Sequence, residues 1–259
     1  MNLFINLAIA IIPTIILCLY VYKMDVIEKE PTNMLLKLFF LGILITIPVA
    51  FIETKLLDIT GLEETDYLSC FLIAFFIVAL VEELHKYIVL YLGTWNNKNF
   101  NHIYDPIVYA VFISLGFATL ENILYIVNGS NTSSLQVGIM RALISVPAHA
   151  FYATSSGYYL GLSKLSHSIG YKKDEIIFKI LSLLVPILLH GIFDFFLFTG
   201  NQIHIAFFYA FVVILYFISF SNIRKLSAVN MTSDLQKTIV SETKKEEEPN
   251  EDNKSSLDM

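Results

Sequence analysis

The sequence predicts an all-α fold, a polytopic membrane bundle of about seven transmembrane helices. Of its 259 residues, 56% are hydrophobic and only 15% are charged, which is outside the usual range of soluble domains. Seven apolar runs reach the roughly 20 residues that a helix needs to cross a bilayer. Barrel strands would instead be short and alternating. The predicted spans are residues 2–22, 34–54, 67–92, 106–128, 137–163, 175–199 and 202–221.

The first apolar run is predicted to be a retained span. It lacks a basic leading region and a small-residue cleavage site, and it is longer than a signal-peptide core. The sixth and seventh runs nearly meet at Gly200, so a tight turn is expected there.

Lysine and arginine residues alternate between the predicted connections. Cationic short loops favour the cytoplasmic side of a membrane. The alternation therefore predicts a multi-pass cell-membrane protein with its N-terminus outside and its C-terminus in the cytoplasm. The cationic set is Lys23 and Lys29, Lys98, Lys164, Lys172 and Lys173, and Arg224 and Lys225.

Composition also limits the partners and the domain organisation. A net charge of -6 gives no general attraction to nucleic acid. Cys18 and Cys70 both fall in apolar runs, where packing is the simpler interpretation. We expect one transmembrane domain over residues 1–222 and a disordered, charged cytoplasmic tail over 223–259, because the tail has little apolar surface to bury.

Several ionisable residues interrupt the predicted spans. Each costs roughly 2.5 to 3.5 kcal/mol near a bilayer centre, so such groups usually face a protein interior or a wet cavity. Their distribution over four spans predicts one shared polar site and makes an intramembrane hydrolase the leading hypothesis. These residues are Glu82, Glu83, Lys86, Glu121, His149, His190 and Asp194.

The third span carries two adjacent acids. Glu82 and Lys86 are four residues apart and share a helix face, with Glu83 about 100° round the helix. One carboxylate can then act as a general base while the other orients it. The structural alternative is a Glu82–Lys86 pair that joins neighbouring helices. His85 is expected to point elsewhere.

The fourth and fifth spans contribute an acid and an imidazole. Glu121 and Asn122 have no cation in their own span, so Glu121 is either a water-activating or metal-binding carboxylate or a structural hydrogen-bonding group. His149 follows Pro147, which is expected to kink the helix and open space near the ring. Its alternatives are a ligand and a packing histidine. Arg141 is expected to reach the outer interface and contact headgroups.

The sixth span pairs His190 with Asp194 at i, i+4, so the carboxylate can fix the imidazole tautomer. Counted at 1.5 Å per residue along each helix, Glu82, Glu121, His149 and His190 reach nearly the same depth. They can therefore meet at one level of the membrane.

At these residues the chain resembles the PrsW family of intramembrane proteases, within a broader group that includes the CAAX prenyl endopeptidases. The family's E-E-x-x-K matches residues 82–86, its F-A-x-x-E matches Phe117 to Glu121, and its H-x-x-x-D matches His190 to Asp194. In the CAAX endopeptidases the second motif ends in His and the third in Asn, so lipid-modified substrates are not expected. The resemblance implies peptide-bond hydrolysis in or near the membrane. It also suggests a single-span anti-sigma factor as the substrate, cleaved during envelope-stress signalling.

The mechanism predicted from these residues is water activation by a glutamate. Glu82, assisted by Glu83 and Glu121, would deprotonate the attacking water, and His190 or His149 would stabilise the oxyanion or bind a metal. Two histidines and a carboxylate, here His149, His190 and Glu121, match the ligand count of catalytic zinc or another divalent metal. Lys86, Asn122, Asp194 and Phe117 would support the site.

Two other classes of function compete with the protease. A proton- or cation-coupled transporter also uses intramembrane acids and histidines, although the paired broken helices of inverted repeats are not evident. The other competitor is a non-catalytic scaffold with an inactive site.

Overall fold

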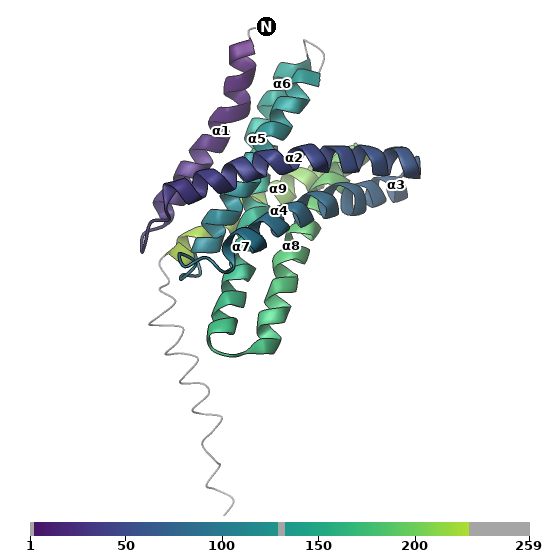
Figure 1. The fold of residues 1–259 in the computed structure, drawn as a ribbon. Coiled ribbons are helices and arrows are strands. Elements are labelled where there is room, and N and C mark those ends of the chain that lie inside the picture. The colour runs from purple at the N-terminus through teal and green to yellow at the C-terminus, as the bar shows by residue number, and fades with distance from the viewer. Residues whose placement is uncertain (1–2, 129–132, 228–259) are drawn as a thin grey trace, which may run out of the picture.

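The computed structural model describes residues 3–128 and 133–227, and these form a bundle of long helices (Figure 1). The elements are α1 (Leu3–Met24), α2 (Thr32–Thr60), α3 (Tyr67–Leu72), η1 (Ile73–Ala79), α4 (Leu80–Thr94), α5 (Asp105–Asn128), α6 (Ser133–Met140), η2 (Arg141–Ser145), α7 (Val146–Ser168), α8 (Lys172–Thr199) and α9 (Gln202–Ser227). In Figure 1, α7 and α8 form a hairpin whose connection lies at the end of the molecule opposite the N-terminus.

The predicted spans agree with the helices. Within the described residues, 6 helical stretches are long and apolar enough to cross a membrane. The fifth predicted span is the exception, because α6, η2 and α7 are helical but less apolar. Most residues of α7 are buried against other helices, so this segment does not need a lipid-compatible surface.

Two glycines allow helices to approach closely. A Cβ on Gly116 of α5 would lie 2.0 Å from the backbone oxygen of Phe39 in α2, and one on Gly157 of α7 would lie 2.4 Å from Ile107 Cα in α5. Small residues of this kind bring membrane helices into backbone contact. α5 is thereby held between α2 and α7, and most of its residues are buried.

The connections follow local sequence signals. Gly200 adopts φ 61°, a left-handed conformation that glycine enters without strain, and so allows the tight turn between α8 and α9. Asp66 caps α3 by accepting from the backbone N–H groups of Leu68 and Ser69. The predicted charged tail lies outside the described residues from 228 onward, and residues 223–227 belong to α9. Cys18 and Cys70 are both buried and unpaired, as expected for packing residues.

Two π-helical turns interrupt the α-helices shortly before Glu82 and His149. η1 and η2 are π-helical, and they precede Glu82 and His149 by a few residues each. Pro147 lacks a backbone N–H and lies two residues after the end of η2, so the expected distortion before His149 takes the form of a π turn. Such turns add a residue to the helix and change which side chains face the interior.

Candidate active site

α4 directs three charged side chains into the bundle. Lys86 Nζ donates to Glu82 Oε2 at 2.8 Å and to Glu83 Oε1 at 2.9 Å. All three residues are buried, with relative exposures of 3%, 4% and 5% for Glu82, Glu83 and Lys86. An ammonium between two carboxylates offsets the repulsion that these charges exert at low dielectric. The two acids can therefore lie next to each other inside the bundle.

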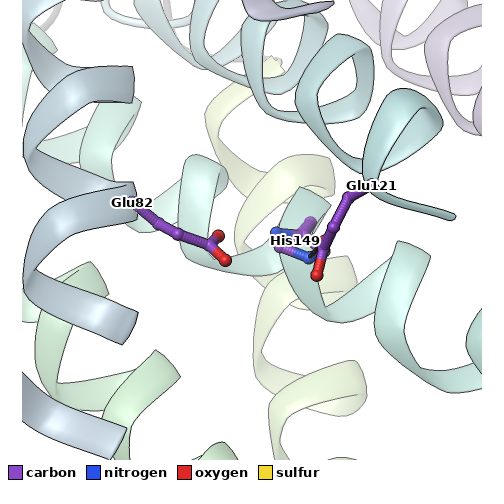
Figure 2. Close-up of side chains that lie close together, drawn as sticks. All are labelled: Glu82, Glu121 and His149. Carbon is purple, nitrogen blue, oxygen red and sulfur yellow. Dashed lines mark ion pairs between the residues drawn. The ribbon is translucent and has the colours of Figure 1, made fainter. Parts of the chain in front are cut away.

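His149 of α7 joins α4 to α5. Its Nδ1 lies 3.2 Å from Lys86 Nζ, and its Nε2 lies 3.0 Å from Glu121 Oε2. An ammonium can only donate, so Nδ1 accepts and Nε2 carries the hydrogen that faces Glu121. Figure 2 shows Glu82 pointing toward the imidazole, with Glu121 beside the ring.

His190 of α8 lies between two acids. Its Nδ1 is 2.9 Å from Glu83 Oε1, and its Nε2 is 3.2 Å from Asp194 Oδ2. Ionised carboxylates only accept hydrogen bonds, so with both acids ionised each ring nitrogen donates. Tyr152 stacks on the imidazole with ring centroids 4.9 Å apart. The ring is thereby fixed in both position and orientation.

The residues singled out in the sequence therefore form one continuous network. It runs from Asp194 through His190, Glu83 and Lys86 to Glu82 and His149, and ends at Glu121. These distances show that the residues expected to share one polar site lie together in the bundle. His85 lies outside the network, as expected, because its Nδ1 contacts the backbone oxygen of Val81 at 2.7 Å.

The supporting residues surround this network. The Phe117 ring lies 4.2 Å below Lys86 Nζ, a cation–π contact inside the bundle. Asn122 is buried, and its Oδ1 accepts a hydrogen bond from Arg141.

A cavity of about 310 Å³ opens beside the network. Glu82, Glu121, His149, His190 and Asp194 line its polar side, whereas Glu83 and Lys86 lie behind it. Its other walls come mainly from α6, η2, α8 and α9 and are mostly aromatic and aliphatic. A peptide segment with apolar side chains could contact these walls while its backbone faces the acids and imidazoles. The apolar wall includes Met140, Ile144, Phe193, Phe196, Phe208 and Tyr209.

Two groups of donor atoms in the described part of the chain are close enough to share a metal ion. Glu82, Glu121 and His149 form one, and Glu82, Glu83 and His190 form the other, with donor atoms within 4.8 Å of one another. The sequence-based set of His149, His190 and Glu121 is thus divided between them. The first group fits a metal better, because it lines the cavity and its buried Glu121 Oε2 has no aligned hydrogen bond. In the second, Glu83 Oε1 already contacts Lys86 and His190.

Sequence reasoning missed two residues of the site. Arg141 does not reach an outer interface as expected: its Nη2 lies 2.8 Å from Glu121 Oε1, and its side chain is only 16% exposed. The π turn at η2 places it there, and the sequence gives no direct sign of that turn. Glu53 of α2 also lines the cavity, with Oε1 buried and unpaired. An acid near the end of an otherwise apolar span was the available signal for Glu53.

Comparisons with known proteins identify the family of the chain. Residues 30–220 match the family model described as PrsW family intramembrane metalloprotease. The chain is 36% identical to a protein named Protease PrsW from Clostridioides difficile, over 84% of this chain and 89% of the relative. It is 34% identical to a protein of the same name from Bacillus subtilis, over 88% of this chain and 99% of the relative. No solved structure matches it.

Proposed function

Because the chain belongs to the PrsW family of intramembrane metalloproteases, we propose that it cleaves a single-span membrane protein at the cavity beside Glu82, Glu121 and His149. Its membership makes it a multi-pass intramembrane protease and decides against the transporter. The observation that carries the site assignment is the meeting of three helices at one buried acid–imidazole group that faces a cavity.

Glu82 is the general base in this proposal. It lines the cavity, and its Oε2 is held by Lys86, which leaves the side chain oriented toward His149. A base must lie within hydrogen-bond reach of the proton it removes, here that of a water in the cavity. Glu83 contributes from behind by fixing Lys86 and His190.

His190 and His149 act on the substrate carbonyl from the polar wall. His190 is held by Glu83 and Asp194 with both ring nitrogens bound, so its charge favours negative charge that develops in the cavity. His149 presents Nε2 next to Glu121. Donors that are already oriented cost no reorganisation during reaction.

A metal-dependent form of this proposal would use the same residues: Glu82, Glu121 and His149 would hold a divalent metal, with zinc matching their carboxylate and imidazole donors. Glu82 would then be a ligand in place of the base, and His149 Nε2 would bind without its hydrogen. A metal held there would polarise the scissile carbonyl and make water easier to deprotonate.

The substrate that we propose is an anti-sigma factor with one membrane span, cleaved at the outer side. The lysine and arginine alternation supports an outside N-terminus and predicts that the α8–α9 turn is also outside. Residues on both sides of that turn, Phe198 and Ile205, line the cavity. The cavity therefore lies near the α8–α9 turn, which is on the outer side in the orientation that we propose.

The test uses the purified full chain in lipid vesicles with a fluorescent single-span peptide. We expect cleavage by the natural chain, loss of cleavage in Glu82→Gln, and retention in Glu63→Gln, a matched change at an exposed acid. Equal cleavage by all three proteins would refute the role of Glu82. An intact peptide with the natural chain would refute this class of substrate.

A further inference from the structure

We propose that Arg141 is a positioning residue of the proteolytic site, which holds Glu121 in the orientation that faces His149. The inference rests on the proposed function, because Glu121 is a member of the reacting group there. It assigns a role to a residue that lies outside all three sequence motifs.

The backbone explains how Arg141 reaches the cavity. It is the first residue of η2, between α6 and the helix that carries His149. The π turn adds a residue ahead of Pro147, and the side chain lines the cavity. Its position therefore depends on the same distortion that precedes His149.

Arg141 contacts three side chains of α5. Its Nη2 lies 2.8 Å from Glu121 Oε1, and its Nε donates to Asn122 Oδ1 at 2.7 Å. The guanidinium carbon lies 4.0 Å from the centroid of the Tyr125 ring. The hydrogen bond to Asn122 and the cation–π contact with Tyr125 hold the guanidinium in place, and Nη2 forms an ion pair with Glu121 that lacks hydrogen-bond alignment.

This arrangement uses one oxygen of Glu121 and leaves the other for the site. Oε1 contacts Arg141, whereas Oε2 lies 3.0 Å from His149 Nε2. Without the guanidinium, the carboxylate could rotate toward Lys86 or into the cavity. A misplacement of about 1 Å in a reacting group can reduce the rate about 100-fold.

The alternative is that Arg141 only fastens η2 to α5. A fastening role predicts that substitution lowers thermal stability and that a small molecule in place of the side chain does not restore activity. A positioning role predicts a lower kcat with little change in KM. It also predicts recovery when free guanidinium occupies the vacated space beside Glu121.

The experiment compares the natural chain, Arg141→Ala and Arg141→Lys in lipid vesicles. We expect Arg141→Ala to lower kcat by about 100-fold when it is assayed at a temperature where the variant stays folded. Some loss of thermal stability is expected as well, because the substitution removes one partner of a largely buried ion pair. Millimolar guanidinium should restore part of that activity. Arg141→Lys should recover little, because an ammonium is a point charge that cannot contact Glu121 and Asn122 in the same plane.

Two controls accompany these variants. Arg224→Ala changes the other arginine of the chain, which is exposed near the end of α9 and away from the cavity. It should leave kcat unchanged. Glu82→Gln should stay inactive with guanidinium, which shows that rescue is specific to the vacated site.

A second measurement does not depend on turnover. Zinc affinity is measured by competition with a chelator. Loss of a residue that orients a ligand typically weakens metal binding by about 10- to 100-fold, and we expect this range for Arg141→Ala.

The outcomes separate the two proposals. An inactive natural chain overturns the proposed function. An active natural chain with an unaffected Arg141→Ala variant overturns only the role of Arg141, and so does an Arg141→Ala variant that loses stability and is not rescued.

Discussion

Lys86 connects the acids of the site to its imidazole. Its ammonium contacts Glu82, Glu83 and His149, and it lies over the ring of Phe117. All of these groups are buried, so water cannot replace the lysine as a partner for the two carboxylates. The adjacent acids therefore depend on this one side chain.

Lys86→Met is expected to destabilise the protein and abolish cleavage. Removal of one partner from a buried ion pair leaves an uncompensated charge, which costs about 3 to 5 kcal/mol. The matched variant is Lys55→Met, whose ion pair with Asp58 is exposed by more than half on both sides. Its expected cost is below about 1 kcal/mol. The free energy of unfolding in detergent, measured for both variants, checks the contrast. Equal losses would contradict it.

His190 and His85 lie in different environments, so their substitution should affect cleavage differently. His190 is held by Glu83 and Asp194 at the cavity, whereas His85 contacts only its own helix backbone among the bonds described. We expect His190→Ala to reduce kcat by at least about 100-fold and His85→Ala to leave it near that of the natural chain. Cleavage rates of the fluorescent peptide test this. A comparable loss in His85→Ala would show that the site extends along α4 beyond the network.

At the scale of the helices, the site depends on contacts that bring backbones together. α5 carries Glu121, and its position is set by α2 on one side and α7 on the other through Gly116 and Gly157. Regular helical periodicity does not predict the π turns η1 and η2, because they depend on tertiary packing as well as on Pro147. The direction of Arg141 was wrongly predicted for this reason.

Gly116→Ala is expected to separate α2 from α5. The added methyl would lie 2.0 Å from the backbone oxygen of Phe39, which cannot move like the end of a flexible side chain. Overpacking of this kind typically costs about 1 to 3 kcal/mol, and the shift of α5 should also lower cleavage through Glu121.

Gly93→Ala serves as the control for this substitution. Its nearest neighbour would be Leu38 Cδ2 at 3.4 Å, an ordinary contact. Because alanine is favoured over glycine inside a helix, this variant should be as stable as the natural chain or more stable. Thermal unfolding in detergent distinguishes the two, and an equally stable Gly116→Ala would show that α2 and α5 can separate freely.

For the whole molecule, the sequence predicted the long membrane-spanning helices and the polar residues that cluster inside the bundle. Long apolar runs and the high cost of charge in lipid made both predictions possible. The contacts within the site could not be predicted, since they depend on how each helix is rotated. The spacing of Glu82 and Lys86 within one helix was enough to predict their contact. The contact of Lys86 with His149 and the stacking of Tyr152 on His190 join different helices, so only the structure shows them.

A second buried acidic region joins the α1–α2 connection to the first turns of α5, the helix that also carries Glu121. Glu30 is 3% exposed, and the Tyr109 hydroxyl donates to its Oε2 at 2.6 Å. Asp105 is fully buried and accepts from the backbone N–H groups of Asn101 and His102. Burial raises the pKa of Glu30 to about 7, with the nearby carboxylate of Asp25 adding to the shift and the Tyr109 hydrogen bond opposing it.

This raised pKa predicts a stability that falls as the pH rises. The unfolded chain releases the Glu30 proton near the ordinary value of 4.5, whereas the folded protein keeps it to about pH 7. Between these values the folded state binds more protons, so each rise in pH favours the unfolded state.

Glu30→Gln removes this proton and keeps an acceptor for Tyr109. The thermal midpoint of the natural chain in detergent should therefore fall more than that of Glu30→Gln between about pH 4.5 and 7. Glu28→Gln, at an acid whose side chain is 57% exposed, should follow the natural chain. If the natural chain and Glu30→Gln show the same pH dependence, Glu30 does not hold a proton in the folded protein.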